Sequence, residues 1–182
     1  METLPFLLFL AVHIVSLITG MGAVFVVDTF GLLWLFGKID LKVVTRVANV
    51  TQKLIWIGWV GLVLSGLGLI TIKGYVDNLT MIKLFFVVLV GANGIFLHVI
   101  KKAMERIPDE SAMPAYLKFR IGLASAISQT GWWGAATIGF LHRHWHHYIG
   151  WPDVPVLYMI GILIIILVAA FIGEVSFNRK SG

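Results

Sequence analysis

The 182-residue sequence contains no cysteine. This absence excludes disulfide bonds, thiolate metal ligands and iron–sulfur clusters, so a redox metal would need histidine, methionine, lysine or carboxylate ligands. Charged residues are also scarce, at 13% of the chain, whereas hydrophobic residues make up 59% and the mean hydropathy is +0.93. So few charges cannot cover the surface of a soluble domain. The composition therefore indicates a protein that lies in a lipid bilayer.

Long apolar runs give the predicted fold, because about 18 to 20 apolar residues cross the roughly 30 Å hydrocarbon core of a membrane. We find five such runs, at residues 7–36, 54–72, 81–100, 121–141 and 156–175. The first run follows Glu2 instead of a basic segment and is about twice as long as the core of a signal peptide, so we interpret it as a retained helix. The sequence predicts an all-α polytopic membrane bundle of five transmembrane helices, which form a single domain over residues 1–182.

The basic residues predict the orientation of these helices, since Lys and Arg concentrate on the cytoplasmic side of membrane proteins. With five spans, one side would carry Lys38, Lys42, Arg46, Lys53, Lys101, Lys102, Arg106, Lys118, Arg120, Arg179 and Lys180, and the other would carry Lys73, Lys83 and Arg143. This asymmetry predicts an outside N-terminus and a cytoplasmic C-terminus. It also accounts for the pI of about 9.6 without a nucleic-acid partner. Residues 37–53 alternate charged and apolar residues and suggest a short amphipathic piece along the inner interface.

Two histidines lie inside apolar runs, where ionisable side chains are costly and tend to face the bundle interior. His13 lies near the outer side of the first run, and His98 lies near the inner side of the third. Helical steps of three and four give each histidine small neighbours: Ser16, Gly20 and Ala23 for His13, and Gly91 and Gly94 for His98. Such faces either allow close helix packing or leave room for a flat macrocycle beside a ligating imidazole.

The stretch FLHRHWHHYIGW at 140–151 holds the other four histidines, His142, His144, His146 and His147. His142 and His146 are four residues apart, and His144 and His147 three, so a continuing helix would place each pair on one face. The cluster contains no carboxylate, which favours copper, zinc or haem iron over calcium or magnesium. The alternative is a titrating loop at the outer membrane surface.

Other polar residues have structural interpretations. Asn93 and Gln129 lie at comparable depth and could hydrogen-bond across the bundle. Asp28 and Glu174 lie near inner ends of spans, where snorkelling or a nearby cation would suffice. Trp132 and Trp133 suit either an interfacial belt or the lining of an aromatic ligand.

The stretches FLLFLAVHIVSLITGMGAVF and MIKLFFVVLVGANGIFLHVIKK resemble small bacterial membrane proteins of the HemJ-type protoporphyrinogen oxidases and the CopD-type copper-resistance proteins. The resemblance covers the first and third spans, and it implies a b-type haem bound by His13 with Lys83 as a partner or catalytic group. In place of the tryptophan that commonly follows the histidine in the HemJ type, this chain has IVSLITG.

The leading hypothesis is a membrane-embedded b-type haem protein with a redox or electron-transfer role. His13 would pair with a histidine of the cluster or of another subunit in a homo-oligomer, and His98 would hold a second haem. One alternative is a CopD-like protein that handles copper or zinc through His13, His98, His142, His146 and His147. Another is a HemJ-like oxidase, and the electron donor and acceptor, a quinone among them, stay open.

Overall fold

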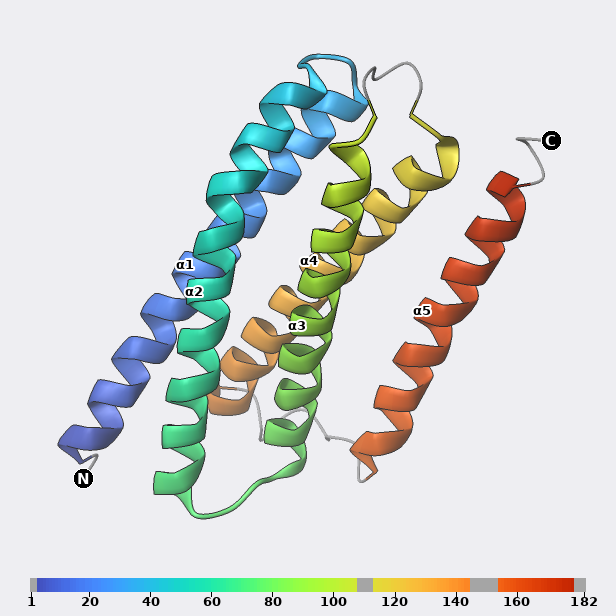
Figure 1. Cartoon of the computed structure of the whole chain (residues 1–182). Coiled ribbons are helices and arrows are strands. Elements are labelled where there is room, and N and C mark those ends of the chain that lie inside the picture. Colours follow the sequence, from blue (N-terminus) through green and yellow to red (C-terminus); the bar gives the residue numbers. More distant parts are fainter. Residues whose placement is uncertain (1–2, 108–112, 145–153, 179–182) are drawn as a thin grey trace. The chain divides into compact units, whose positions relative to one another are not determined.

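The computed structural model describes residues 3–107, 113–144 and 154–178, and its secondary structure over these residues is helical (Figure 1). The five helices are α1 (Leu4–Leu35), α2 (Leu41–Lys73), α3 (Asn78–Met104), α4 (Ala115–His144) and α5 (Pro155–Asn178). No strand occurs in the described ranges. The all-α prediction is therefore confirmed for this part of the chain.

Four of the described helices are long and apolar enough to cross a membrane: α1, α2, α3 and the Pro155–Ser176 portion of α5. The helix α4 has sufficient length, with 30 residues, but the serines, glutamine, threonine and glycines of its middle lower its hydropathy. The described helices thus indicate a multi-pass membrane protein. The fifth crossing and the orientation of the termini stay predictions.

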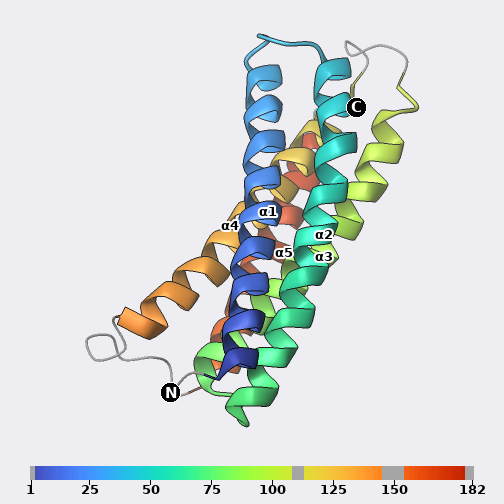
Figure 2. The ribbon, with the colours of Figure 1, turned by 90° about the vertical axis from the view of Figure 1, so that its left-hand side faces the viewer.

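The chain divides into two compact units, residues 1–77 and 78–182. In the first unit, α1 and α2 lie side by side in opposite directions and form a helical hairpin (Figures 1 and 2). The turn between them begins at Gly37, whose φ of 67° is one that glycine adopts without steric cost. Its N–H bonds to the carbonyl of Trp34, and the N–H of Lys38 bonds to that of Leu33. This pair of bonds satisfies the last carbonyls of α1 and ends the helix.

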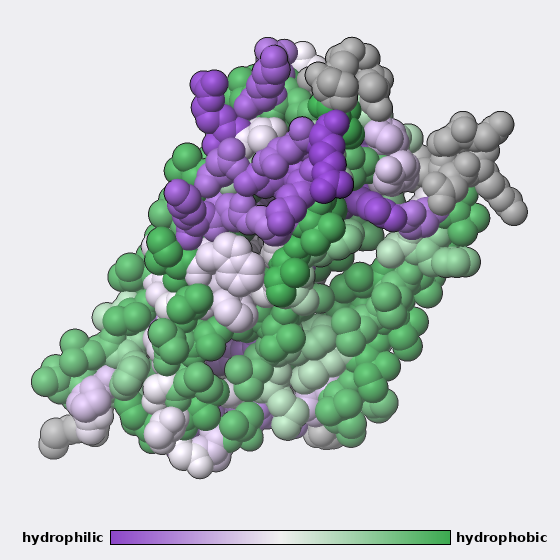
Figure 3. All heavy atoms as spheres, viewed as in Figure 1, coloured by the Kyte–Doolittle hydropathy of each residue, from purple (hydrophilic) through white to green (hydrophobic). Residues whose placement is uncertain are grey.

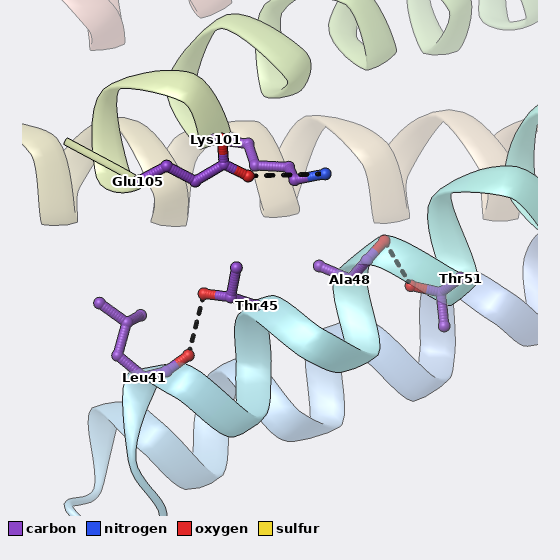
Figure 4. A network of polar contacts seen from close by, with 6 residues as sticks. All are labelled: Leu41, Thr45, Ala48, Thr51, Lys101 and Glu105. Atoms are coloured by element: carbon purple, nitrogen blue, oxygen red, sulfur yellow. Dashed lines mark hydrogen bonds and ion pairs between the residues drawn. The ribbon is translucent and has the colours of Figure 1, made fainter.

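The structure departs from the sequence-based expectation at the start of α2. Residues 37–53 do not form a separate interfacial piece, because from Leu41 onward they are the first turns of a continuous 33-residue helix. Neither proline nor glycine interrupts 41–57. The hydroxyls of Thr45 and Thr51 bond to carbonyls of their own helix (Figure 4). At 1.5 Å per residue α2 is about 50 Å long, which exceeds the roughly 30 Å hydrocarbon core.

The second unit contains α3, α4 and α5. The buried apolar residues of α3 recur at helical spacing, at Leu79, Ile82, Phe86 and Val90. Leu79, Ile82 and Phe86 form a cluster with Ile138 of α4, and Met159 and Ile162 of α5 pack against it. These contacts place the core of this unit along the inward face of α3.

Candidate functional site

The α1–α2 hairpin contains the predicted small-residue face around His13. Four residues of α1 meet four positions of α2 in reverse order, as antiparallel helices require. The pairs are Phe9 with Gly68, His13 with Ser65, Ser16 with Gly61 and Gly20 with Gly58. The second helix of the hairpin therefore occupies the α1 face. Of the two interpretations of this face, helix packing or room for a macrocycle, the contacts favour helix packing.

The approach of the two helices is closest at Gly58. A Cβ atom added to Gly58 would lie 2.6 Å from the Cα and N of Gly20 and 2.7 Å from the backbone oxygen of Ser16. Three turns of helix away, a Cβ at Gly68 would overlap the ring of Phe9. Glycine at these positions lets the helices pack at a separation that any side chain would prevent.

His13 makes a hydrogen bond across this interface. Its Nδ1 lies 2.9 Å from Oγ of Ser65, a side chain that is only 1% exposed. The Ser65 hydroxyl donates its single proton to the backbone carbonyl of Gly61 at 2.6 Å. Because that proton is already used, the hydroxyl oxygen accepts from the imidazole, and Nδ1 of His13 carries the hydrogen. In the neutral ring the lone pair then lies on Nε2, the nitrogen that can bind a metal.

On one side, the imidazole ring of His13 lies beside a glycine, Gly66. A Cβ at Gly66 would lie 3.6 Å from Cε1 and 3.9 Å from Nδ1 of His13, which is ordinary van der Waals contact. His13 is half-buried. The α2 glycines therefore leave the ring uncrowded while Ser65 sets its orientation.

Our sequence-based reasoning identified His13 but missed Ser65 and the α2 glycines that face it. Their signal is present in the sequence: Gly58, Gly61, Ser65 and Gly68 recur at steps of three and four residues, the same spacing as the α1 face. Two such faces on consecutive helices predict a close antiparallel contact.

The other candidate residues of α3 have different surroundings. His98 is exposed, whereas the buried residues Asn93 and Ile100 mark the inward face of the same helix. Lys83 is half-buried near the start of α3. A ligand held by His98 would lie against the surface of the 78–182 unit and not within its core.

The histidine cluster falls largely outside the described residues. His142 and His144 belong to the last turn of α4, with side chains that are not described, and His146 and His147 lie beyond the helix in the undescribed range 145–153. Across the described ranges, no three His, Asp or Glu side chains gather as a metal site would require. The structure therefore does not test the predicted metal-binding role of the cluster.

Two polar contacts of the second unit join different helices. Nδ2 of Asn93 donates to the backbone carbonyl of Ala124 on α4 at 2.7 Å, where the sequence suggested the side chain of Gln129 as partner. Glu174 of α5 accepts a hydrogen bond from Nε of Arg120 at 2.5 Å, so it has the nearby cation that we expected. This bond raises the pKa of Arg120 above its usual value, against the opposing effect of burial. These contacts hold α4 against α3 and α5.

The two adjacent tryptophans of α4 differ in exposure. Trp132 is 2% exposed, and its Nε1 has no hydrogen-bond partner among the described residues. Trp133 is 49% exposed. Only Trp133 therefore has the exposure that an interfacial belt requires.

Comparisons of the chain with protein-family models, with curated proteins and with solved structures give no match.

Proposed function

We propose that this protein is a membrane-embedded b-type haem protein with a redox role, and that Nε2 of His13 would bind the haem iron. The observation that carries the proposal is the hydrogen bond from Nδ1 of His13 to Ser65. A metal-binding histidine almost always donates its other ring N–H to a fixed acceptor, which sets the tautomer and the ring plane. Ser65, whose side chain is buried between α1 and α2, provides that acceptor.

The packing of the hairpin limits where the macrocycle can lie. Because α2 covers Ser16 and Gly20, a porphyrin cannot occupy the face between the two helices. The half-buried ring of His13 leaves the flank of the hairpin, beside Gly66, as the position we propose. When bound, haem supplies one-electron transfer, while the protein residues orient the ligand and exclude water.

A second protein ligand would complete the binding of the haem iron. We propose a histidine from His142, His144, His146 or His147, or from a second copy of the chain, and a second haem at His98. This arrangement includes α4 as a fifth crossing, an outside N-terminus and a bacterial cytoplasmic membrane. The resemblance of the first and third spans to the HemJ type adds Lys83 as a candidate catalytic group.

The visible spectrum of the detergent-purified protein tests the proposal. We expect a Soret band, and a sharp α band after reduction with dithionite, as low-spin haem gives. His13→Ala should remove at least half of the pigment per protein. A colourless protein that stays colourless after haem is supplied would reject the proposal, and copper or zinc found instead by elemental analysis would favour the CopD-like alternative.

Ser65→Ala tests the orienting hydrogen bond separately from the ligand. Loss of the acceptor removes the hydrogen bond from Nδ1–H and makes the imidazole a weaker base, so the midpoint potential should rise. We expect a rise of no more than about 60 mV, which corresponds to a tenfold change in a one-electron equilibrium. Ser125→Ala on α4 serves as the matched control and should leave the potential unchanged. An unchanged potential in Ser65→Ala, with pigment retained, would contradict a role of this hydrogen bond in tuning the haem.

A further inference from the structure

A groove with a volume of about 550 Å³ runs along the hairpin. Its walls include Thr19, Gly22 and Val26 of α1 and Arg46, Val50 and Leu54 of α2. A Cβ added to Gly22 would meet nothing within 4 Å, so the groove is open at this glycine. The antiparallel register of the hairpin places Arg46 at one end of the groove and Thr19 at the other.

The walls of the groove present hydrocarbon. The hydroxyl of Thr19 donates to the carbonyl of Val15 at 2.8 Å, and that of Thr51, which also lines the groove, donates to the carbonyl of Val47 at 3.0 Å. Both threonines thereby turn their polar atoms to their own helices. Arg46 is the charged residue of the lining.

Arg46 differs from other cations of the chain in its surroundings. Lys73 lies 2.7 Å from Asp77, and Arg120 bonds to Glu174. Within the described ranges, no acidic side chain lies within 4 Å of the exposed Arg46 or of its neighbours Lys42 and Lys53. Helical steps of four and seven place these three cations on one side of α2. In Figure 3 hydrophilic residues lie over the first turns of α2, and hydrophobic residues predominate over its later turns.

We propose that this groove binds one anionic phospholipid, with its phosphate at Arg46 and an acyl chain along the apolar walls toward Thr19. A guanidinium forms paired hydrogen bonds with phosphate, and Lys42, about one helical turn from Arg46, adds positive potential around the head group. Arg46 lies eight residues before Leu54, or about 12 Å along the helix axis, so head-group and chain contacts are separated as in a phospholipid. A free phosphate would leave the apolar length of the groove unused.

Native mass spectrometry of the full-length protein in detergent tests this site. The protein is incubated with equal amounts of phosphatidylglycerol and phosphatidylcholine that carry identical dioleoyl chains. We expect one phosphatidylglycerol to be retained at least about fivefold more than phosphatidylcholine. Equal retention of the two lipids by the wild-type protein would overturn the proposal.

Two pairs of variants locate the lipid. Arg46→Gln should lower phosphatidylglycerol retention about tenfold, whereas Arg106→Gln, which removes another exposed arginine outside the groove, should leave it unchanged. Gly22→Leu places a side chain in the groove and should lower retention of the same lipid, whereas Gly31→Leu, also at an open position of α1, should not.

Each pair contradicts the proposal if its two members behave alike. Should Gly22→Leu fail to fold, Val50→Phe fills the groove from α2 at a position that is 62% exposed. Retention by Arg46→Gln at the wild-type level would overturn the head-group assignment by itself. The measurement does not depend on haem, so a colourless protein that retains the lipid would reject the proposed function alone.

Discussion

The α1–α2 hairpin and the α3–α4 pair both use glycine to bring helices together, but they use it differently. In the hairpin, Gly58 faces the backbone of Gly20 and Ser16. In the second pair, Gly131 and Gly134 of α4 receive the side chains of Val90 and Phe86 from α3. A side chain can rotate or be shortened, whereas a backbone cannot. The hairpin is therefore the less adaptable of the two contacts, and it is the one that positions His13.

The largest effect is expected from Gly58→Ala. The added Cβ would lie 2.6 Å from backbone atoms of Gly20, so the helices must separate. We expect a loss of about 3 kcal/mol, the upper end of typical overpacking costs. Thermal unfolding in detergent, followed by circular dichroism, measures it.

Gly31→Ala is the control for this variant, because its Cβ meets no atom within 4 Å. It should stabilise α1 by about 0.5 to 1 kcal/mol through the higher helix propensity of alanine. If Gly58→Ala unfolds no earlier than Gly31→Ala, the hairpin is not packed backbone to backbone.

A smaller effect is expected from Gly131→Ala. Its Cβ would overlap a γ-methyl group of Val90, at a cost of about 1 kcal/mol after the gain in helix propensity. In the double variant with Val90→Ala the same substitution should become stabilising, since the obstructing methyl is gone. A double-mutant cycle of melting temperatures measures this change of sign. No change of sign would mean that the α3–α4 pair is as rigid as the hairpin.

Next in size is Asn93→Leu, which removes the bond to the carbonyl of Ala124 while keeping a similar volume. Hydrogen bonds between membrane helices contribute about 0.6 kcal/mol on average, and we expect a loss of this order. A double-mutant cycle between His13→Ala and Ser65→Ala should give a similar coupling energy for the hairpin. A coupling several times larger would show that polar bonding, and not glycine packing, distinguishes the two regions.

The smallest effect is expected from Glu174→Gln. The side chains of Arg120 and Glu174 are 40% and 30% exposed, so solvent screens the ion pair, and we expect a loss of about 0.5 kcal/mol. Glu105→Gln is the control: Glu105 lies 3.9 Å from Lys101 on the same helix and is more exposed (Figure 4). It should change the melting temperature by no measurable amount. Equal shifts in the two variants would argue against a role for Arg120 in docking α5.

The sequence predicted the helices well because apolar runs of bilayer length have few alternative structures. It also predicted that Ser16, Gly20 and Ala23 share the face of His13, since helical periodicity fixes which residues lie together on one helix. All three are buried. The start of α2 was not predicted. Charged residues in 41–53 mark the end of an apolar run, but they do not stop helical hydrogen bonding.

The partner of His13 could not be predicted from periodicity. Ser65 is 52 residues away in the chain, and the spacing within one helix does not specify which other helix will cover its face. The tautomer of His13 could not be predicted either, because it depends on the donation of the Ser65 proton to the carbonyl of Gly61. The position of His98 could not be predicted from periodicity either. Small neighbours at helical spacing suggested that it faces inward, but its side chain is exposed.

The helix α5 has a consequence for how this sequence can change over time. Only 6% of the most apolar 18-residue window of α5 is buried, so in a bilayer hydrocarbon chains of the lipid would surround most of its side chains. An exchange among leucine, isoleucine and valine on that surface replaces one lipid-solvated group with another and leaves the packing intact. Most of α5 can therefore drift freely in sequence, while Gly173, whose Cβ would overlap the ring of Phe119, and Glu174 stay constrained.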